Sequence, residues 1–412
     1  MQTWRIKASL FLNYFVFAIL LNSVGTVIFL VQQSFFVSKT QASVLEPCKD
    51  LSIAVVSFLV TSFITRLGYK RAMLMALGFI SLICFVIPLT NSFVAVQLLF
   101  IAVGASFALI KMSVYSSIGL VTGDAHGHAS LMNFVESFFG VGIVSSYFIF
   151  SWFVNKSNPA STSWLQVYFL LGGISLLAFV LLLGAPLDES AAKSEGPANM
   201  LQDVASMFRL FTIPLVLVFI LCAFFYVLIE QSIMSWLPTF NKEVLKLDAS
   251  LSIQMASILA AAIALGRFLA GLLLKKISWL WLLMGCLVLA AAILLISLPI
   301  ISRFVTQYKG NGISTLGEVP LVAFVFPLIG LLLGPIYPAV NSVILSSLPR
   351  PKHGFMAGLI IIFSALGGSL GSIITGVIFE HYSGQHAMYF SLIPITILII
   401  CLVLFRRLQA GR

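Results

Sequence analysis

About twelve long apolar stretches run through this chain and restrict it to a small set of folds. A transmembrane helix needs about 20 apolar residues, because the hydrocarbon core of a bilayer is about 30 Å thick. Hydrophobic residues fill 60% of the 412 positions and charged residues only 9%, which is not typical of a soluble domain. We therefore expect an all-α, multi-pass membrane protein. Its helices are predicted near 8–32, 42–65, 72–90, 94–121, 130–154, 164–186, 211–237, 250–274, 278–301, 319–348, 356–380 and 386–406.

The basic residues indicate how these helices are oriented. Lys and Arg give a formal net charge of +10, but they stand at segment ends rather than on one soluble face, so nucleic-acid binding is not expected. Loops on the side of both termini hold more than twice as many of them as loops on the opposite side. By the positive-inside rule, both termini lie in the cytoplasm. We expect a protein of the bacterial inner (cytoplasmic) membrane.

The sequence gives no sign of an enzyme or of a bound cofactor. It has neither a Gly-Lys-Ser/Thr phosphate-binding loop nor a nucleophile elbow. Asp124, His126 and His128 could be taken for metal ligands, but they lack a fourth ligand nearby and fit a solvated loop better. All five cysteines fall within predicted helices, so no disulfides are expected. The start lacks a cleavable signal, so the first helix is expected to be retained.

The longest polar interruption divides the apolar segments into two groups of six. It covers 187–209, after six segments in 1–186 and before six in 210–412. Gly and basic residues recur at the cytoplasmic ends of helices 2 and 8, within 65–71 and 266–276. Positive-inside anchoring alone could explain either group. Their recurrence favours two six-helix bundles related by pseudo-two-fold symmetry and joined by a cytoplasmic linker.

Four short motifs carry a resemblance to known membrane helices. They are Gln41 to Lys70, which ends Ile64-Thr65-Arg66-Leu67-Gly68-Tyr69-Lys70; Gly266-Arg267-Phe268 with Gly271; Ile336-Tyr337-Pro338 with Ser342 and Leu348; and Leu366-Gly367-Gly368 with Gly371. In these motifs, which span most of the chain, the sequence resembles the fucose:proton symporter family of the major facilitator superfamily. The resemblance implies that superfamily's fold, in which helices 1, 4, 7 and 10 line a cavity and helices 3, 6, 9 and 12 face lipid.

Two departures from the family pattern concern its chemistry. The sugar symporters carry an acid in helix 1, whereas the matching region from Asn22 to Thr26 has none. Their helix 4 acid falls near Ile110, where the neighbouring ionisable residue is the cation Lys111. The residues tied to sugar and proton handling in that family are therefore missing, and hexose transport by the same chemistry is not expected.

Ionisable residues inside the apolar segments are the strongest functional signal. A charge in hydrocarbon costs roughly 2.5–3.5 kcal/mol on insertion scales, so such groups face a wet interior or a partner. They occupy helices 2, 4, 5, 7 and 8 and avoid helices 3, 6, 9 and 12. This distribution predicts a polar path through the interior. The residues are Glu46, Lys49, Asp50, Lys111, Glu136, Glu230 and Arg267.

Three of these charges share one face of helix 2. Glu46, Lys49 and Asp50 are spaced i, i+3 and i+4, which brings them together on an α-helix. Lys49 can neutralise one acid and leave the other to bind a proton. We assign Glu46 and Asp50 to proton coupling and Lys49 to substrate binding. The alternative is a structural salt-bridge cluster at the outer mouth of the helix.

Lys111 and Glu136 lie at similar depth on helices 4 and 5. Lys111 can hold a carboxylate or phosphate as a point charge, and Glu136 is the candidate proton-coupling acid. The alternative is an internal Lys111–Glu136 pair. Both roles can coexist if such a pair opens on protonation.

A polar run on helix 7 predicts a further part of the binding site. Glu230 and Gln231 precede Ser235 and Trp236, so polar groups stand beside an aromatic platform. The alternative is the wet outer end of a helix. The substrate-binding residues expected with this run are Lys49, Lys111, Glu230, Gln231, Tyr226, Tyr337 and Asn341.

Other residues are assigned to structure and gating. Gly330 and Gly334-Pro335 predict a bend or break in helix 10, because Pro removes a helical hydrogen bond. Arg267 is expected mainly to fix helix 8 against its neighbours. The structural and gating candidates are Arg66, Gly68, Lys70, Arg71, Gly266, Arg267, Gly271 and Pro338.

These observations predict a proton-coupled secondary active transporter that works by alternating access. Lys49 and Lys111 favour a small polar solute with a carboxylate, and import is favoured because the resembled family imports. The alternatives are an efflux pump for amphipathic or toxic compounds, a sugar or nucleoside:proton symporter, and a non-transporting sensor. The expected partners are the solute, protons and the lipid bilayer, and the protein is expected to be a monomer without a cofactor or metal.

Overall fold

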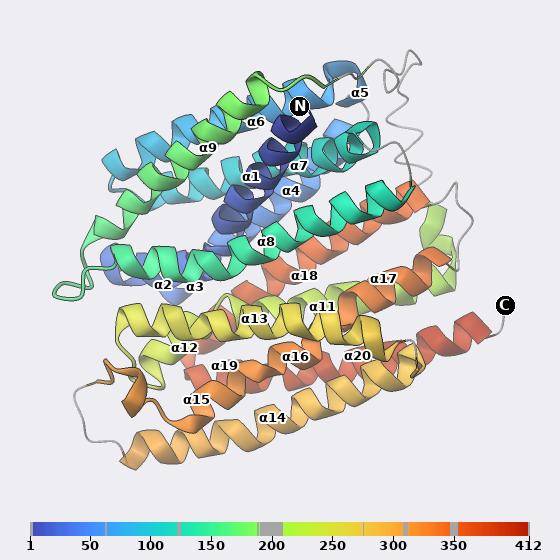
Figure 1. Cartoon of the computed structure of the whole chain (residues 1–412). Helices are drawn as coiled ribbons and strands as arrows, with labels where there is room; N and C mark the ends of the chain where they lie inside the picture. Colours follow the sequence, from blue (N-terminus) through green and yellow to red (C-terminus); the bar gives the residue numbers. More distant parts are fainter. Residues whose placement is uncertain are drawn as a thin grey trace. The chain divides into compact units, whose positions relative to one another are not determined.

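The computed structural model describes nearly all of the predicted membrane segments. The described residues are 3–61, 64–121, 125–187, 189, 209–274, 276–307, 312–346 and 353–410. They are mostly helical, with one isolated parallel β-bridge between Leu247 and Ile313 (Figure 1). The predicted linker at 187–209 falls largely outside the described residues, as does Asp124.

The chain forms two compact units. Unit 1 comprises Met1–Val24, Cys48–Asn155 and Ala160–Leu201, and unit 2 comprises Gly25–Pro47, Lys156–Pro159 and Gln202–Arg412. The segment Gly25–Pro47 thus clusters with unit 2, although it lies between two stretches of unit 1 in the sequence. The bundle boundaries expected from the sequence remain a prediction.

Unit 1 is built around α1, which packs against α7, α8 and α9, while α6 packs against α7 and α9. These contacts bring the candidate residues of predicted helices 4 and 5 beside the first helix. The helices of this unit are α1 (Thr3–Asn22), most of α4 (Leu45–Thr61), α5 (Ile64–Leu67), α6 (Tyr69–Val86), α7 (Phe93–Val121), α8 (Ala125–Phe153) and α9 (Val167–Leu183).

Unit 2 is built around α11, which packs against α17, α18 and α20, while α13 packs against α12 and α16. The predicted break in helix 10 is present, because Gly334 and Pro335 separate α16 from α17. The helices are α2 (Val24–Ser34), α3 (Lys39–Ser43), α11 (Pro214–Met234), α12 (Leu237–Glu243), α13 (Ala249–Leu273), α14 (Trp279–Gln307), α15 (Leu321–Val325), α16 (Ile329–Leu333), α17 (Ile336–Ser346), α18 (His353–His381), α19 (Gly384–Phe390) and α20 (Leu392–Ala410).

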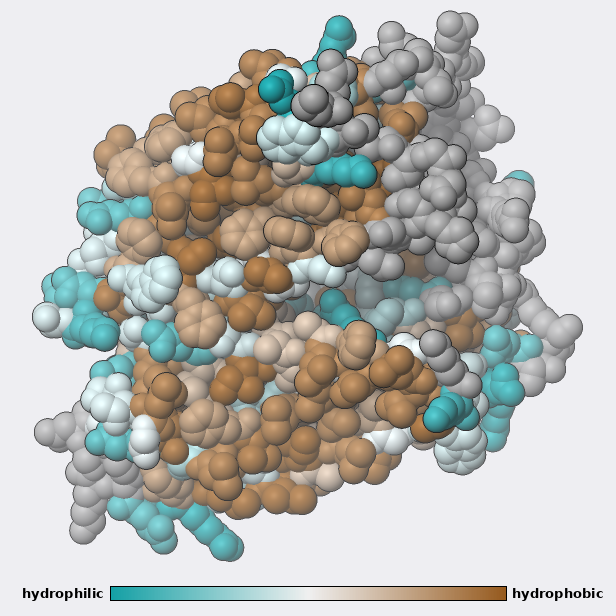
Figure 2. All heavy atoms as spheres, viewed as in Figure 1, coloured by the Kyte–Doolittle hydropathy of each residue, from teal (hydrophilic) through white to brown (hydrophobic). Residues whose placement is uncertain are grey.

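The expectation of a multi-pass membrane protein is confirmed by helix length and composition. Eleven helices of the described residues are long and apolar enough to cross a bilayer. The remaining predicted segment, 42–65, contains α4, whose described part is 17 residues long and includes three charged side chains. Figure 2 shows hydrophobic side chains over broad areas of the helix surfaces, with hydrophilic ones gathered near the helix ends. Such exposed apolar surface suits contact with lipid.

Two pairs of helices in unit 2 approach each other through glycine. Gly266 of α13 lies against the backbone of Leu331, and Gly334 lies against the backbone of Ile263. On the other side of the unit, Gly371 of α18 lies against the backbone of Leu228 in α11. A side chain at these glycines would collide with backbone atoms. Small residues that permit such close approach are a common basis of helix association in membranes.

The segment Gly25–Pro47 is held within unit 2 by polar contacts. Lys39 forms an ion pair of 3.1 Å with Glu243 of α12, and the Thr40 N–H donates to the Glu380 carboxylate of α18 at 2.7 Å. Ser38 caps α3 with a capping box that includes Gln41. These contacts fix the start of α4 and therefore the position of Glu46.

Candidate functional site

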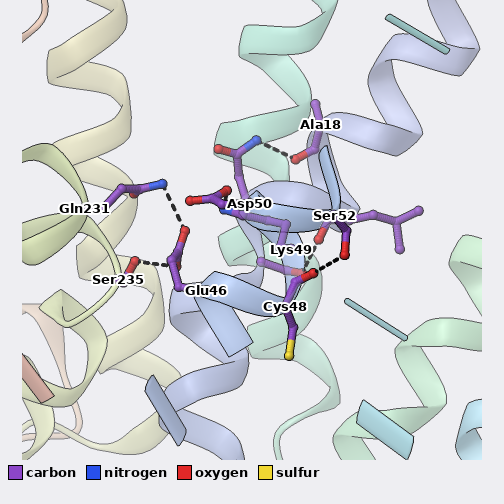
Figure 3. A network of polar contacts seen from close by, with 11 residues as sticks. Ala18, Glu46, Cys48, Lys49, Asp50, Ser52, Gln231 and Ser235 are labelled. Atoms are coloured by element: carbon purple, nitrogen blue, oxygen red, sulfur yellow. Dashed lines mark hydrogen bonds and ion pairs between the residues drawn. The ribbon is translucent and has the colours of Figure 1, made fainter. Parts of the chain in front are cut away.

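Glu46 lies at the centre of a hydrogen-bonded group within unit 2. Its side chain is fully buried, and its carboxylate accepts hydrogen bonds from Gln231 Nε2 at 3.0 Å and from Ser235 Oγ at 2.8 Å. Gln231 of α11 and Ser235, the C-cap residue of that helix, are four residues apart and both point toward the carboxylate (Figure 3). A buried carboxylate needs such partners, because desolvation without them is costly.

The same part of α11 is anchored on its other side by Trp236. The indole Nε1 donates to the Ser372 carbonyl of α18 at 2.9 Å, and the ring is fully buried. Gly25 of α2 also lies close to α11, because a Cβ at Gly25 would stand only 2.8 Å from the Ser235 Cα. The Glu46 group therefore sits in tightly packed surroundings, where its donors have little freedom to move.

One turn further along α4, Lys49 and Asp50 form an ion pair in unit 1. The Lys49 Nζ lies 3.3 Å from Asp50 Oδ1, and both side chains are largely buried. Gly104 of α7 lies against the Lys49 carbonyl, which brings α4 and α7 close together. A buried ion pair is costly to desolvate and weak evidence for stability, so its presence in a membrane segment favours a functional reading.

Glu230 lies on α11 and has one charged and one neutral partner. Its Oε1 accepts from the Tyr226 hydroxyl at 2.8 Å and pairs with Arg267 Nη2 of α13 at 3.3 Å. The Arg267 side chain is 46% exposed and the Glu230 side chain 15% exposed, so solvent screens this pair in part. The pair links α11 to α13, and the carboxylate keeps a partly accessible oxygen.

The Tyr226 ring extends this group toward α17 and α18. Tyr226 stacks on Tyr337 with ring centroids 5.5 Å apart, and the Tyr337 hydroxyl bonds with Ser364 Oγ at 3.0 Å. Asn341, one turn beyond Tyr337 on α17, has a buried Oδ1 without a hydrogen-bond partner among the described residues. A buried acceptor without a partner costs free energy, and a ligand donor could satisfy it.

Lys111 and Glu136 lie in an aromatic part of unit 1. The half-buried Lys111 Nζ stands 6.0 Å from the ring centroids of both Phe107 and Tyr115. The Glu136 carboxylate, on an exposed side chain, accepts a hydrogen bond of 2.5 Å from the Tyr115 hydroxyl. Within the described part of the chain, Lys111 and Glu136 do not form an ion pair. The direct pair that was one alternative from the sequence is therefore absent, and Glu136 is bonded to Tyr115 instead.

Lys70 and Gly68 lie at one end of unit 1, where Lys70 contacts the end of α9 and Gly68 precedes α6. Gly68 has a φ of 89°, a conformation that favours glycine, and precedes α6. The Lys70 Nζ donates to the carbonyls of Leu183 and Ala185 at the end of α9, at 3.1 and 2.6 Å. The Glu189 carboxylate accepts from the Lys70 N–H at the start of α6. Both charges suit the helix dipoles.

The other gating candidates differ in their surroundings. Arg71 and Pro338 are exposed, and a Cβ at Gly271 would meet no atom within 4 Å. The Arg66 side chain lies outside the described residues, as do the side chains of His126 and His128. In the described part of the chain, no group of three or more His, Cys, Asp or Glu residues could hold a metal ion. The five cysteines are free thiols.

Several residues of these groups were not assigned to the site from the sequence. Tyr115 lies one turn from Lys111, so helical spacing alone could have found it. Ser364 and Tyr14 lie on helices far away in sequence and carried no signal. Ser235 was noted only as part of a polar run, although it donates directly to Glu46.

Known proteins share features of this sequence and of its fold. The family model described as Major Facilitator Superfamily matches residues 10–308, and no curated protein matches the sequence significantly. Among solved structures, the D-xylose-proton symporter is 12% identical with a TM-score of 0.76 and coverage of 100% of both chains. The nucleoside transporter NupG is 13% identical with a TM-score of 0.75, covering 98% of this chain and 100% of its own.

The E. coli fucose:proton symporter FucP is also similar. It is 16% identical with a TM-score of 0.63, and the match covers 98% of this chain and 99% of the symporter. At these identities the likeness concerns the fold. The full-length matches confirm the fold that the sequence predicted, an all-helical membrane protein of the facilitator type.

Proposed function

Because this chain belongs to the Major Facilitator Superfamily, a family of transporters rather than enzymes, we propose that it is a proton-coupled transporter of a small polar solute that carries a carboxylate. The protein is a multi-pass membrane protein and a secondary transporter with a small-molecule substrate. We favour import of the solute by alternating access across a bacterial inner membrane. In this orientation both termini lie in the cytoplasm.

The observation that carries this proposal is the environment of Lys111. The residue lies within the apolar span Phe93–Ile118, and the ion pairs of the described residues do not include it. A cation at such a position is costly unless it meets an anion. Glu136 is near enough to interact with this charge, but its carboxylate is bonded to Tyr115. A carboxylate on the solute supplies a direct point-charge partner for the ammonium group.

Three acids supply candidates for proton coupling. Glu46 is held by the neutral donors Gln231 and Ser235, Asp50 by Lys49, and Glu136 by Tyr115. Protonation of any of these carboxylates weakens its hydrogen bonds, since bonds to charged groups are the stronger ones. Gain or loss of a proton can therefore change which contacts hold the helices, and we propose Glu136 and Glu46 as the main coupling acids.

A test of the substrate class is uptake by cells that overproduce the protein. We expect radiolabelled carboxylic solutes to accumulate when the external medium is acidified, and Lys111→Met to abolish accumulation while Lys111→Arg retains part of it. Lys156→Met removes an exposed loop cation and serves as the matched control. Uptake that is confined to neutral solutes, or unchanged in Lys111→Met at equal expression, contradicts the proposal.

A second candidate, a sugar or nucleoside:proton symporter, is favoured by one observation in unit 2. The stacked rings of Tyr226 and Tyr337 stand beside the unpartnered Asn341 acceptor and the Glu230 carboxylate. An aromatic surface with nearby hydrogen-bonding groups suits a ring that carries hydroxyls. Asn341→Leu separates the candidates, because it should impair a hydroxylated ligand far more than a simple carboxylate.

A further inference from the structure

A set of six side chains in unit 1 combines both signs of charge with aromatic walls. We call this set the Lys111–Glu136 site. Its residues come from three helices that pack together, α1, α7 and α8. They are Tyr14, Phe107, Lys111, Tyr115, Glu136 and Phe139.

The two charges of this site are near each other but held apart. Lys111 and Glu136 are close enough for their charges to interact, yet the Glu136 carboxylate takes its hydrogen bond from Tyr115. The Lys111 ammonium stands 6.0 Å from the ring centroids of both Phe107 and Tyr115, at the outer limit of a cation–π contact. Such a contact is weaker than a desolvated ion pair with good geometry, so the Lys111 ammonium and the Glu136 carboxylate can both still bind a ligand.

Tyr14 adds a buried aromatic ring and a hydroxyl group to the site. Its side chain is 1% exposed, and its hydroxyl interacts with that of Tyr115. The Tyr14 ring centroid lies 6.0 Å from that of Tyr115 and 5.5 Å from that of Phe139. The Tyr115 hydroxyl thus links Tyr14 to the Glu136 carboxylate, and the three rings form an aromatic wall beside both charges.

The geometry points to recognition of a zwitterion, an amino acid or a related amino carboxylate, at the Lys111–Glu136 site. The ligand carboxylate binds the Lys111 ammonium, and the ligand ammonium binds the Glu136 carboxylate beside the face of Tyr115. This inference rests on the proposed function and narrows its substrate class.

The charges of the site favour a zwitterion over a simple carboxylate. The site carries one positive and one negative charge, and a zwitterion leaves that balance unchanged while it satisfies both groups. A simple carboxylate satisfies Lys111 but brings a second negative charge near Glu136, a repulsion that low polarity strengthens. A simple amine satisfies Glu136 but brings a second positive charge near Lys111. The aromatic faces add affinity for the ligand's ammonium group.

The test uses a panel of L-amino acids as probes, each with two analogues. One is the 2-hydroxy acid, which lacks the ammonium group, and the other is the methyl ester, which lacks the carboxylate. Binding is measured by isothermal titration calorimetry on the purified full-length protein in detergent. We expect at least one amino acid to bind, and both of its analogues to bind at least about tenfold more weakly.

Two variants assign each preference to its residue. Glu136→Gln should remove the preference for the amino acid over the hydroxy acid, while Lys111→Met should remove the preference over the methyl ester. Glu318→Gln and Lys156→Met neutralise exposed loop residues and should keep both preferences. Melting curves select variants that remain folded, and Lys111→Arg, which should keep the preference over the ester, provides a second readout at the same position.

The outcomes distinguish this inference from the proposed function. Hydroxy acids that bind and are transported as well as amino acids overturn the zwitterion inference and leave a carboxylate transporter standing. Preferences that survive in both Glu136→Gln and Lys111→Met overturn the assignment to this site. If no acid in the panel binds and none is transported, both the inference and the carboxylate proposal fail.

Discussion

The hydrogen bond between Ser235 and Glu46 allows a quantitative test of the buried carboxylate. The Ser235 hydroxyl donates to Glu46 at 2.8 Å, and both side chains are buried. A hydrogen bond to a charged group contributes roughly 1.5–3 kcal/mol, against about 0.5–1.5 kcal/mol for a neutral one. Ser235→Ala is therefore expected to lower the free energy of unfolding by about 1.5–3 kcal/mol in the natural protein and by about 0.5–1.5 kcal/mol in a Glu46→Gln background.

The assay is a double-mutant cycle on the purified protein. Unfolding in detergent by denaturant is followed by tryptophan fluorescence, for which the buried Trp236 beside Ser235 is a local reporter. We expect a coupling energy of about 1 kcal/mol or more at neutral pH. Acidification that protonates Glu46 should reduce this coupling toward the value of a neutral hydrogen bond, because the stronger charged bond is then lost.

Ser232→Ala supplies the matched control for this cycle. Ser232 lies on the same helix but donates to the Gly371 carbonyl at 3.2 Å. Its effect should therefore add to that of Glu46→Gln without coupling. A coupling energy for Ser235 and Glu46 that is no larger than that of the control, or that does not change on acidification, would refute the idea that Glu46 is a buried, ionised group held by α11.

Three further predictions concern helix packing and charge. Gly266→Leu should prevent correct folding, because the side chain would collide with the backbone of Leu331, whereas Gly271→Leu should be tolerated; monodispersity on size-exclusion chromatography measures both. Arg267→Met should impair transport more than the Glu230→Gln/Arg267→Met double variant, since the single change leaves the 15% exposed carboxylate without its cation; equal impairment argues against the pair. Gly68→Ala should lower the free energy of unfolding by about 1–3 kcal/mol and therefore lower the melting temperature, because the φ of 89° is strained for a residue with a side chain; an unchanged melting curve contradicts this.

The fold could be predicted from the sequence because hydrocarbon imposes a simple rule on helices. Apolar length located the segments, and Gly334-Pro335 located the break between α16 and α17. The interruption between α1 and α2 was not predicted. At this interruption the Ser23 hydroxyl bonds to the Leu20 carbonyl, but Ser is common in helices and gives no reliable signal.

The candidate site could be predicted only as far as helical spacing reaches. Glu230 and Tyr226 were both expected in the binding site, and their i, i+4 spacing on α11 accounts for the hydrogen bond between them. Contacts between distant helices, such as Gln231 with Glu46 or Tyr337 with Ser364, depend on packing that no local pattern encodes. The Lys111 and Glu136 positions were identified, but the Tyr115 hydroxyl that bonds to Glu136 was not, because a tyrosine in an aromatic helix carries no signal of its partner.

The most direct test of the proposed coupling is proton movement driven by the solute. Proteoliposomes that contain the purified protein and a trapped pH-sensitive dye are given a carboxylate-bearing solute without an imposed pH gradient. The account predicts a change in internal pH that requires the solute, is lost in Glu136→Gln at normal reconstitution, and persists in the loop control Glu318→Gln. Solute uptake without any proton movement, or normal pH-dependent uptake by Glu136→Gln, would contradict it.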